Sequence, residues 1–196
     1  PNNDRWGGKA RPDYDRPPDY VRAYWQLGDE RLLFCDARKF GRISYTRDFA
    51  ATTFIVRHEQ TLLLWHRKSR AWLPPGGHIE PQEWPHEAAV REVLEETGLQ
   101  VELLAEAQDW GTVTVLPPPV CILLENISPG HQHIDLIYFA RVVGGTLQIN
   151  PDEATTAQWY DTHALTGNHI ARDIRILGQR AITAAQCQRA VSAART

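Results

Sequence analysis

The sequence predicts an α/β protein in which helices cover both faces of a mixed β-sheet. Runs rich in β-branched and aromatic residues, typical of strands, lie on both sides of a helical segment at Pro85–Thr97. A second helical segment follows the last of these runs near the C-terminus. Because each apolar face of a sheet needs a cover, two helices placed in this way favour an α/β/α sandwich.

Composition and charge narrow the class of protein. The 196 residues, with 42% hydrophobic and 23% charged residues, suit one globular domain with terminal additions. We expect no membrane-spanning helix, because no apolar run approaches about 18 residues, and no secretion signal. Cys35, Cys121 and Cys187 fit neither a disulfide framework nor a zinc pattern, so we expect a cytoplasmic protein. The net charge of -3 argues against a nucleic-acid partner.

The chain divides into three parts by composition. Residues 1–19 are rich in proline and polar residues and poor in aliphatic ones, which predicts a flexible tail. Residues 20–47 contain two strand-like runs around the turn Gly28-Asp29-Glu30, which predicts an N-terminal β-hairpin. Residues 48–196 form the main domain, whose strand-like runs follow Ala50.

The main domain should open with a second hairpin. Thr52–Val56 and Thr61–Trp65 are its strands, and the segment Leu73-Pro74-Pro75-Gly76-Gly77 that follows them forces a loop. Five further strands are expected at 99–107, 112–116, 120–125, 133–143 and 155–160.

The first expected helix has a signal at each end. Pro85 suits the first position of the helix at 85–97, and Gly98 suits the position just after its end. The i, i+3, i+4 spacing predicts a buried stripe of Ala89, Val90, Val93, Leu94 and Thr97. The second helix should run from His169 to Ala194, with an interruption near Gly178.

Three glutamates share one face of the first helix. Glu92, Glu95 and Glu96 lie at i, i+3 and i+4 in its second half, where the helix dipole and their mutual repulsion disfavour negative charge. A divalent cation among them would remove this cost, and carboxylate oxygens select Mg²⁺, Mn²⁺ or Ca²⁺. The alternative is a solvated acidic face paired with Arg91.

The residues around these glutamates resemble the signature of the Nudix hydrolases. That signature is Gly, five residues, Glu, seven residues, then Arg-Glu-apolar-x-Glu-Glu-x-Gly-apolar. Residues 77–99 match it at Gly77, Glu83, Arg91, Glu92, Val93, Glu95, Glu96, Gly98 and Leu99. The resemblance extends more loosely over residues 50–182, and it departs at Gln82, where many members have glycine.

The resemblance implies a Nudix-type sandwich and a role for each matching residue. Glu92, Glu95 and Glu96 would bind Mg²⁺ or Mn²⁺ together with the backbone carbonyl of Gly77. Arg91 would belong to the catalytic group and, with Glu83, would hold the loop against the helix. Candidates for a further ligand, a base or substrate contacts are Glu125, Asp135 and Glu153, and Trp72 is the candidate for stacking on a nucleobase.

The resemblance also implies an activity. A MutT-like, metal-dependent pyrophosphohydrolase would direct water onto one phosphorus of a nucleoside diphosphate linked to another moiety, including a modified nucleoside triphosphate. The segment Leu73-Pro74-Pro75-Gly76-Gly77 resembles the nucleoside-triphosphate and dinucleotide branches. The alternatives are an ADP-ribose or nucleotide-sugar pyrophosphatase and a non-catalytic nucleotide-binding regulator. The partners implied are a small nucleotide and, in a homodimer, a second copy of the chain, with no membrane partner.

Two further segments leave alternatives open. Residues 21–42 are similar to formamidopyrimidine-DNA glycosylases, with Arg38 and Phe40 at the DNA-inserting positions, but Asn2 replaces the glutamate of their N-terminal Pro-Glu pair. We interpret this segment as a packing hairpin, with a hint of an oxidised guanine substrate. His131, His133 and Asp135 alternate on a strand and share a face. With no fourth zinc ligand evident, we interpret that face as a polar edge or a substrate contact.

Overall fold

The computed structural model describes residues 45–193. The tail expected at residues 1–19 and almost all of the hairpin expected at residues 20–47, including Arg38 and Phe40, lie outside the described residues.

The described chain is built around two long parallel strands. β1 (Thr46–Arg57) and β9 (His131–Gly145) pair in parallel from Thr46↔His131 to Val56↔Arg141. The other pairings in the eight-stranded sheet are antiparallel, and the main path runs β10-β2-β1-β9-β5. Its remaining strands are β2 (Gln60–His66), β3 (Ala71–Leu73), β4 (Gly76–His78), β5 (Leu99–Leu103), β8 (Cys121–Ser128) and β10 (Ala154–Tyr160).

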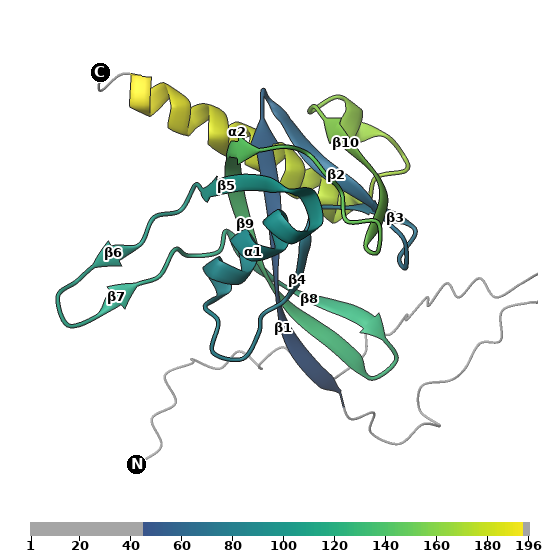
Figure 1. Cartoon of the computed structure of the whole chain (residues 1–196), viewed down its shortest axis with the longest axis horizontal. Coiled ribbons are helices and arrows are strands. Elements are labelled where there is room, and N and C mark those ends of the chain that lie inside the picture. Colours follow the sequence, from purple (N-terminus) through teal and green to yellow (C-terminus); the bar gives the residue numbers. More distant parts are fainter. Residues whose placement is uncertain (1–44, 194–196) are drawn as a thin grey trace, which may run out of the picture. The chain divides into compact units, whose positions relative to one another are not determined.

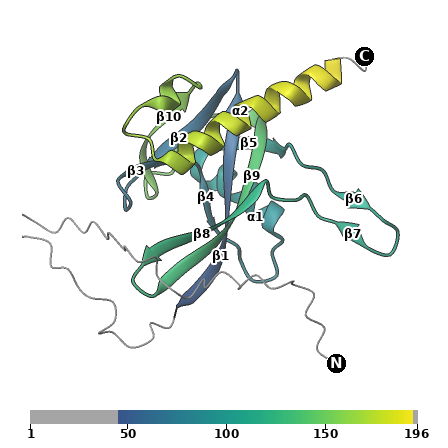
Figure 2. The ribbon, with the colours of Figure 1, turned by 180° about the vertical axis from the view of Figure 1, so that it is seen from behind.

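A helix covers each face of this sheet, which confirms the predicted α/β/α sandwich (Figure 1, Figure 2). α1 is Pro85–Thr97 and α2 is Arg172–Ala193. Side chains alternate along β1: Phe54 belongs to the apolar cluster with Leu177 of α2, and Ile55 to the cluster with Val93 of α1. None of the helices described is long and apolar enough to cross a membrane.

The ends of α1 are where the sequence predicts them. Pro85 occupies the first turn, and the Glu87 carboxylate accepts a hydrogen bond from the Trp84 amide at 3.2 Å. At the other end, Gly98 has φ 68°, a conformation that glycine adopts without strain, and its amide donates to the Leu94 carbonyl at 2.8 Å. These local signals are confirmed.

The buried stripe of α1 was predicted wrongly at Leu94, which is 49% exposed. Val90 is partly buried and packs against the apolar cluster that contains Val93. The buried residues of α1 are Ala88, Ala89, Val93, Glu96 and Thr97. Ala88 and Ala89 pack against Ala51 of β1, and such small residues allow the helix backbone to approach the sheet closely. Because this face of α1 packs on the sheet, Glu96 points toward the protein interior.

The interruption of the second helix near Gly178 is also wrong. α2 is continuous from Arg172 to Ala193 and passes through Gly178. A Cβ atom at Gly178 would lie 3.0 Å from Leu165 Cδ1 and 3.3 Å from Thr61 Cγ2. Glycine therefore serves close packing here, between α2, β2 and the short 3₁₀ turn η2 (Ala164–Thr166).

Several strand boundaries differ from those expected, and β4 begins at Gly76 inside the segment expected to be a loop. β1 and β9 begin at Thr46 and His131, earlier than expected, because their first residues are polar and carry little of the apolar alternation. The strand expected at 99–107 ends at Leu103. β6 (Gln108–Asp109) and β7 (Thr114–Val115) then form a separate two-stranded ribbon that projects from the domain (Figure 1).

Candidate functional site

The signature residues occupy a strand, a loop and a helix that fold onto one another. β4 pairs with β1 through Ala51↔Gly77, and the loop after β4 returns the chain to the start of α1. A Cβ atom at Gly77 would lie 2.5 Å from Glu92 Oε1. Only glycine therefore lets the Glu92 carboxylate rest against the backbone of β4.

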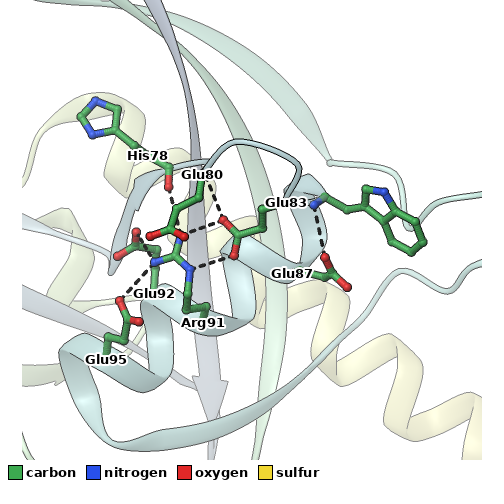
Figure 3. A network of polar contacts seen from close by, with 8 residues as sticks. His78, Glu80, Glu83, Glu87, Arg91, Glu92 and Glu95 are labelled. Atoms are coloured by element: carbon green, nitrogen blue, oxygen red, sulfur yellow. Dashed lines mark hydrogen bonds and ion pairs between the residues drawn. The ribbon is translucent and has the colours of Figure 1, made fainter.

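Arg91 ties the loop to the helix (Figure 3). Its guanidinium donates to both oxygens of Glu83, from Nε to Oε1 at 2.7 Å and from Nη2 to Oε2 at 2.9 Å. Nη1 contacts Glu92 Oε1 at 2.8 Å and Glu95 Oε2 at 3.1 Å, and Nη2 also reaches the His78 carbonyl at 3.0 Å. The hydrogen bond from Arg91 lowers the pKa of Glu83, so this carboxylate stays charged.

We expect Arg91→Lys to lower the free energy of unfolding by about 1–3 kcal/mol, because an ammonium cannot reproduce the two-pronged contact with Glu83. Arg141→Lys is the matched control, since Arg141 makes an exposed ion pair with Glu102 at 2.6 Å. The control should cost less than about 1 kcal/mol. Urea denaturation of both variants measures the difference, and equal losses would contradict a clamping role for Arg91.

Glu96 is the buried member of the three glutamates. Its exposed fraction is 8%, and burial raises its pKa to about 8, helped by the negative charge of Glu92 and, less strongly, of Glu153 and Glu95. A hydrogen bond from the Gly76 backbone works in the opposite direction. Burial also raises the pKa of Glu92, although its hydrogen bond to Arg91 opposes this.

This donor set fits a hard divalent cation. The nearly buried carboxyl of Glu96 lies near the charges of Glu92, Glu153 and Glu95, and its raised pKa indicates that no group among residues 45–193 fully compensates its negative charge. A cation with a preference for oxygen ligands would do so. Gly77 lies where the backbone of β4 meets the Glu92 carboxylate. Because glycine has no side chain, the backbone stays accessible at this point.

The later candidates separate into two locations. Glu153 is near enough to Glu96 for its charge to raise the pKa of Glu96. Asp135 of β9 and Glu125 of β8 instead form a second acidic group with Asp173 at the start of α2. Asp135 and Ile137 are two residues apart on β9, so their side chains share a face of the sheet. Ile137 packs in the apolar cluster with residues of α2, so this acidic group lies on the α2 face.

The carboxyls of the second group are strongly perturbed. Burial raises the pKa of Glu125 to about 7, with a contribution from the charge of Asp135. Burial raises the pKa of Asp135 to about 6 against a hydrogen bond from Thr52. Asp135 is 3% exposed, and its Oδ1 has no hydrogen-bond partner among residues 45–193. Such an oxygen suits a ligand with a hydrogen-bond donor.

Trp72 lies in an aromatic cluster at one end of the sheet. Its ring packs edge-to-face against Trp65 at 5.5 Å and against Tyr160 at 5.4 Å, measured between ring centroids. The stacking of Trp72 on a nucleobase stays a prediction.

Two residues that the sequence analysis did not single out join a predicted pair. Asp48 of β1 and His78 of β4 lie beside His131 and His133 of β9. Only the pairing of β1 with β4 and β9 brings the four together, and no signal in the sequence alone reports that pairing.

The Nudix class of proteins is defined by an α/β/α sandwich with a particular strand–loop–helix segment. This segment carries a glycine, an arginine and three glutamates, as it does here. The chain belongs to the Nudix family, because the model of the NUDIX domain matches residues 46–178.

Individual relatives agree with this assignment. A NUDIX-family hydrolase of known structure from Clostridium perfringens is 32% identical, with a TM-score of 0.64, over 70% of this chain and 97% of that one. "Putative nudix hydrolase 1" of Caenorhabditis elegans is 27% identical over 74% of this chain and 40% of its own length. "Putative 8-oxo-dGTP diphosphatase" of Bacillus subtilis (strain 168) is 29% identical over 56% of this chain and 63% of its own length. The chain thus spans less than two thirds of these two curated relatives.

Proposed function

We propose that this chain is a metal-dependent pyrophosphohydrolase that cleaves a nucleoside diphosphate joined to another moiety. The observation that carries the proposal is the nearly buried carboxyl of Glu96, whose pKa is raised to about 8 beside Glu92 and Glu153. When ionised, such a group complements the charge of a divalent cation, and the cation would in turn bind the phosphate oxygens of a substrate. Membership of the Nudix family supports the reaction class.

In this proposal, Glu92, Glu95 and Glu96 hold Mg²⁺ or Mn²⁺ with the backbone carbonyl of Gly77. The ion, when bound, supplies positive charge to the phosphate oxygens and lowers the pKa of a water. Arg91 is a positioning residue for Glu92 and Glu95, and Glu83 holds Arg91 in turn.

Glu153 is the group that we propose to accept a proton from the attacking water. The support for this assignment is that the charge of Glu153 contributes to raising the pKa of Glu96, which means that the two carboxyls are near one another. The His66 Nε2 atom lies 3.8 Å from Glu153 Oε2.

For the substrate, we propose a nucleoside triphosphate, with a modified guanine base as the specific candidate. The segment Leu73-Pro74-Pro75-Gly76-Gly77 and the name of the Bacillus subtilis relative support this class. Glu125 and Asp135 would contact the base, since carboxyls with raised pKa values can donate as well as accept hydrogen bonds. Trp72 is the proposed stacking residue. The homodimer and the cytoplasmic location also remain predictions.

The test is a panel of dGTP, 8-oxo-dGTP, ADP-ribose, a UDP-sugar and a dinucleoside polyphosphate, incubated with Mg²⁺, Mn²⁺ or a chelator. We expect metal-dependent release of a nucleoside monophosphate, with the highest kcat/KM for a triphosphate. Preference for ADP-ribose or the UDP-sugar would favour that branch instead. Tight nucleotide binding without turnover under every metal condition would identify a regulator and overturn the proposed activity.

A further inference from the structure

We propose that Asp48, His78, His131 and His133 form a second metal site, which takes a transition metal of the Zn²⁺ class and is separate from the glutamates of α1. Each residue offers one ligand atom, and the four atoms all lie within 4.8 Å of one another. Three imidazoles and one carboxylate are a donor set that prefers such a metal to Mg²⁺.

Strand pairing explains why these residues meet. In the parallel ladder of β1 and β9, Asp48 lies opposite His133, and Thr46 lies opposite His131. On the other side of β1, His78 of β4 lies opposite Ala50. Residues two apart on one strand share a face of the sheet, so the side chains from all three strands project to the same side.

Two of the distances between ligand atoms are close to those of a tetrahedral site. The Nε2 atoms of His78 and His133 are 3.1 Å apart, and His131 Nε2 is 3.6 Å from Asp48 Oδ2. With metal–ligand bonds of about 2.0–2.1 Å, ligands in a tetrahedral zinc site are separated by about 3.3 Å. These two separations lie close to that value, and the other pairs of ligand atoms, all within 4.8 Å, would close toward it when an ion binds.

The protonation pattern around His131 also suits a ligand. Thr46 Oγ1 lies 3.0 Å from His131 Nδ1 and 3.3 Å from the Gly130 carbonyl, so in one tautomer His131 Nδ1 donates to this hydroxyl while the hydroxyl donates to the carbonyl. With its proton on Nδ1, His131 presents the lone pair of Nε2 toward Asp48. A hydroxyl or carbonyl that orients an imidazole in this way is the usual support of a metal-binding histidine.

An ion in this site would stabilise the position of β4 and of the loop that connects β4 to α1. The carbonyl of His78 accepts a hydrogen bond from Arg91 Nη2 at 3.0 Å, while its ring points away from the guanidinium (Figure 3). An ion held by His78, His131 and His133 would therefore fix β4 against β1 and β9. Four protein ligands leave no open position, which indicates a structural role and not a catalytic one.

The experiment is a zinc titration of the full chain without a histidine tag, in excess Mg²⁺ so that the carboxylates of α1 are occupied. We expect one Zn²⁺ per chain with a Kd below about 1 µM. Co²⁺ should give the intense visible bands of a tetrahedral site. At 100-fold Zn²⁺ excess over Kd, the melting temperature should rise by about 5–10 °C.

The His131→Gln and His133→Gln variants should each weaken zinc binding by at least about a hundredfold. His163→Gln, which changes an exposed histidine outside the cluster, should bind as the unchanged protein does. Circular dichroism without zinc checks that the variants fold, and Asp48→Asn provides a further variant at an exposed position. Failure to bind Zn²⁺ below about 10 µM, or equal binding by the folded His131→Gln and His133→Gln variants, would overturn the proposal. Neither outcome bears on the nucleotide panel, so the two proposals fail independently.

Discussion

Glu96→Gln is expected to reduce Mg²⁺-dependent turnover by at least about a hundredfold and to leave the fold intact. The carboxyl is 8% exposed, so the substitution removes one ligand charge without changing an exposed surface. Because the pKa of Glu96 is about 8 without a cation, the neutral acid already predominates at pH 7 in the metal-free protein. The neutral amide resembles that state in size and charge, and the expected loss therefore concerns cation binding and not packing.

Glu106→Gln is the matched control, because Glu106 is exposed and lies outside the signature segment. We expect its kcat/KM to be unchanged. Turnover by both variants should be measured over a range of Mg²⁺ concentrations, since a lost ligand shifts the metal requirement and a general loss of fold does not. Near-normal turnover by a folded Glu96→Gln protein would remove Glu96 from the catalytic group.

The parts of this structure that follow from local chemistry could be predicted from the sequence. Pro85 and Gly98 bound α1 because each has a backbone preference that acts on its own position. The spacing of Glu92, Glu95 and Glu96 fixes their common face for the same reason. The order of strands and helices then determines the α/β/α class.

The parts that depend on tertiary contacts could not be predicted. The face of α1 that packs on the sheet is decided by Ala88 and Ala89 against Ala51, and this packing buries Glu96 and exposes Leu94. Gly178 was mistaken for a helix break because the need for glycine there comes from close packing against the side chain of Leu165. That contact is tertiary and is not visible in the local sequence. Asp48 was missed because its histidine neighbours lie more than 80 residues away along β9.

The stability of the metal-free protein is expected to fall as pH rises from about 5 to about 8. Glu96 has a pKa of about 8 in the folded chain and an ordinary value of 4.5 when unfolded. Between these values the folded state keeps a proton that the unfolded state has released. The resulting stabilisation is complete below pH 4.5 and is lost as pH passes through about 8. Glu125 and Asp135, whose pKa values are raised to about 7 and about 6, act in the same direction at lower pH.

Mg²⁺ should oppose this fall, because a cation favours the ionised form of Glu96 and binds the folded state alone. The rise in melting temperature on adding Mg²⁺ should therefore be larger at pH 8 than at pH 6. Glu96→Gln should show a flatter pH profile without metal and a smaller response to Mg²⁺, whereas Glu125→Gln should keep the response. Thermal melts at pH 5 to 9, with Mg²⁺ or a chelator, measure all three proteins. A Mg²⁺ response that is the same at every pH would mean that Glu96 is not among the groups to which the cation binds.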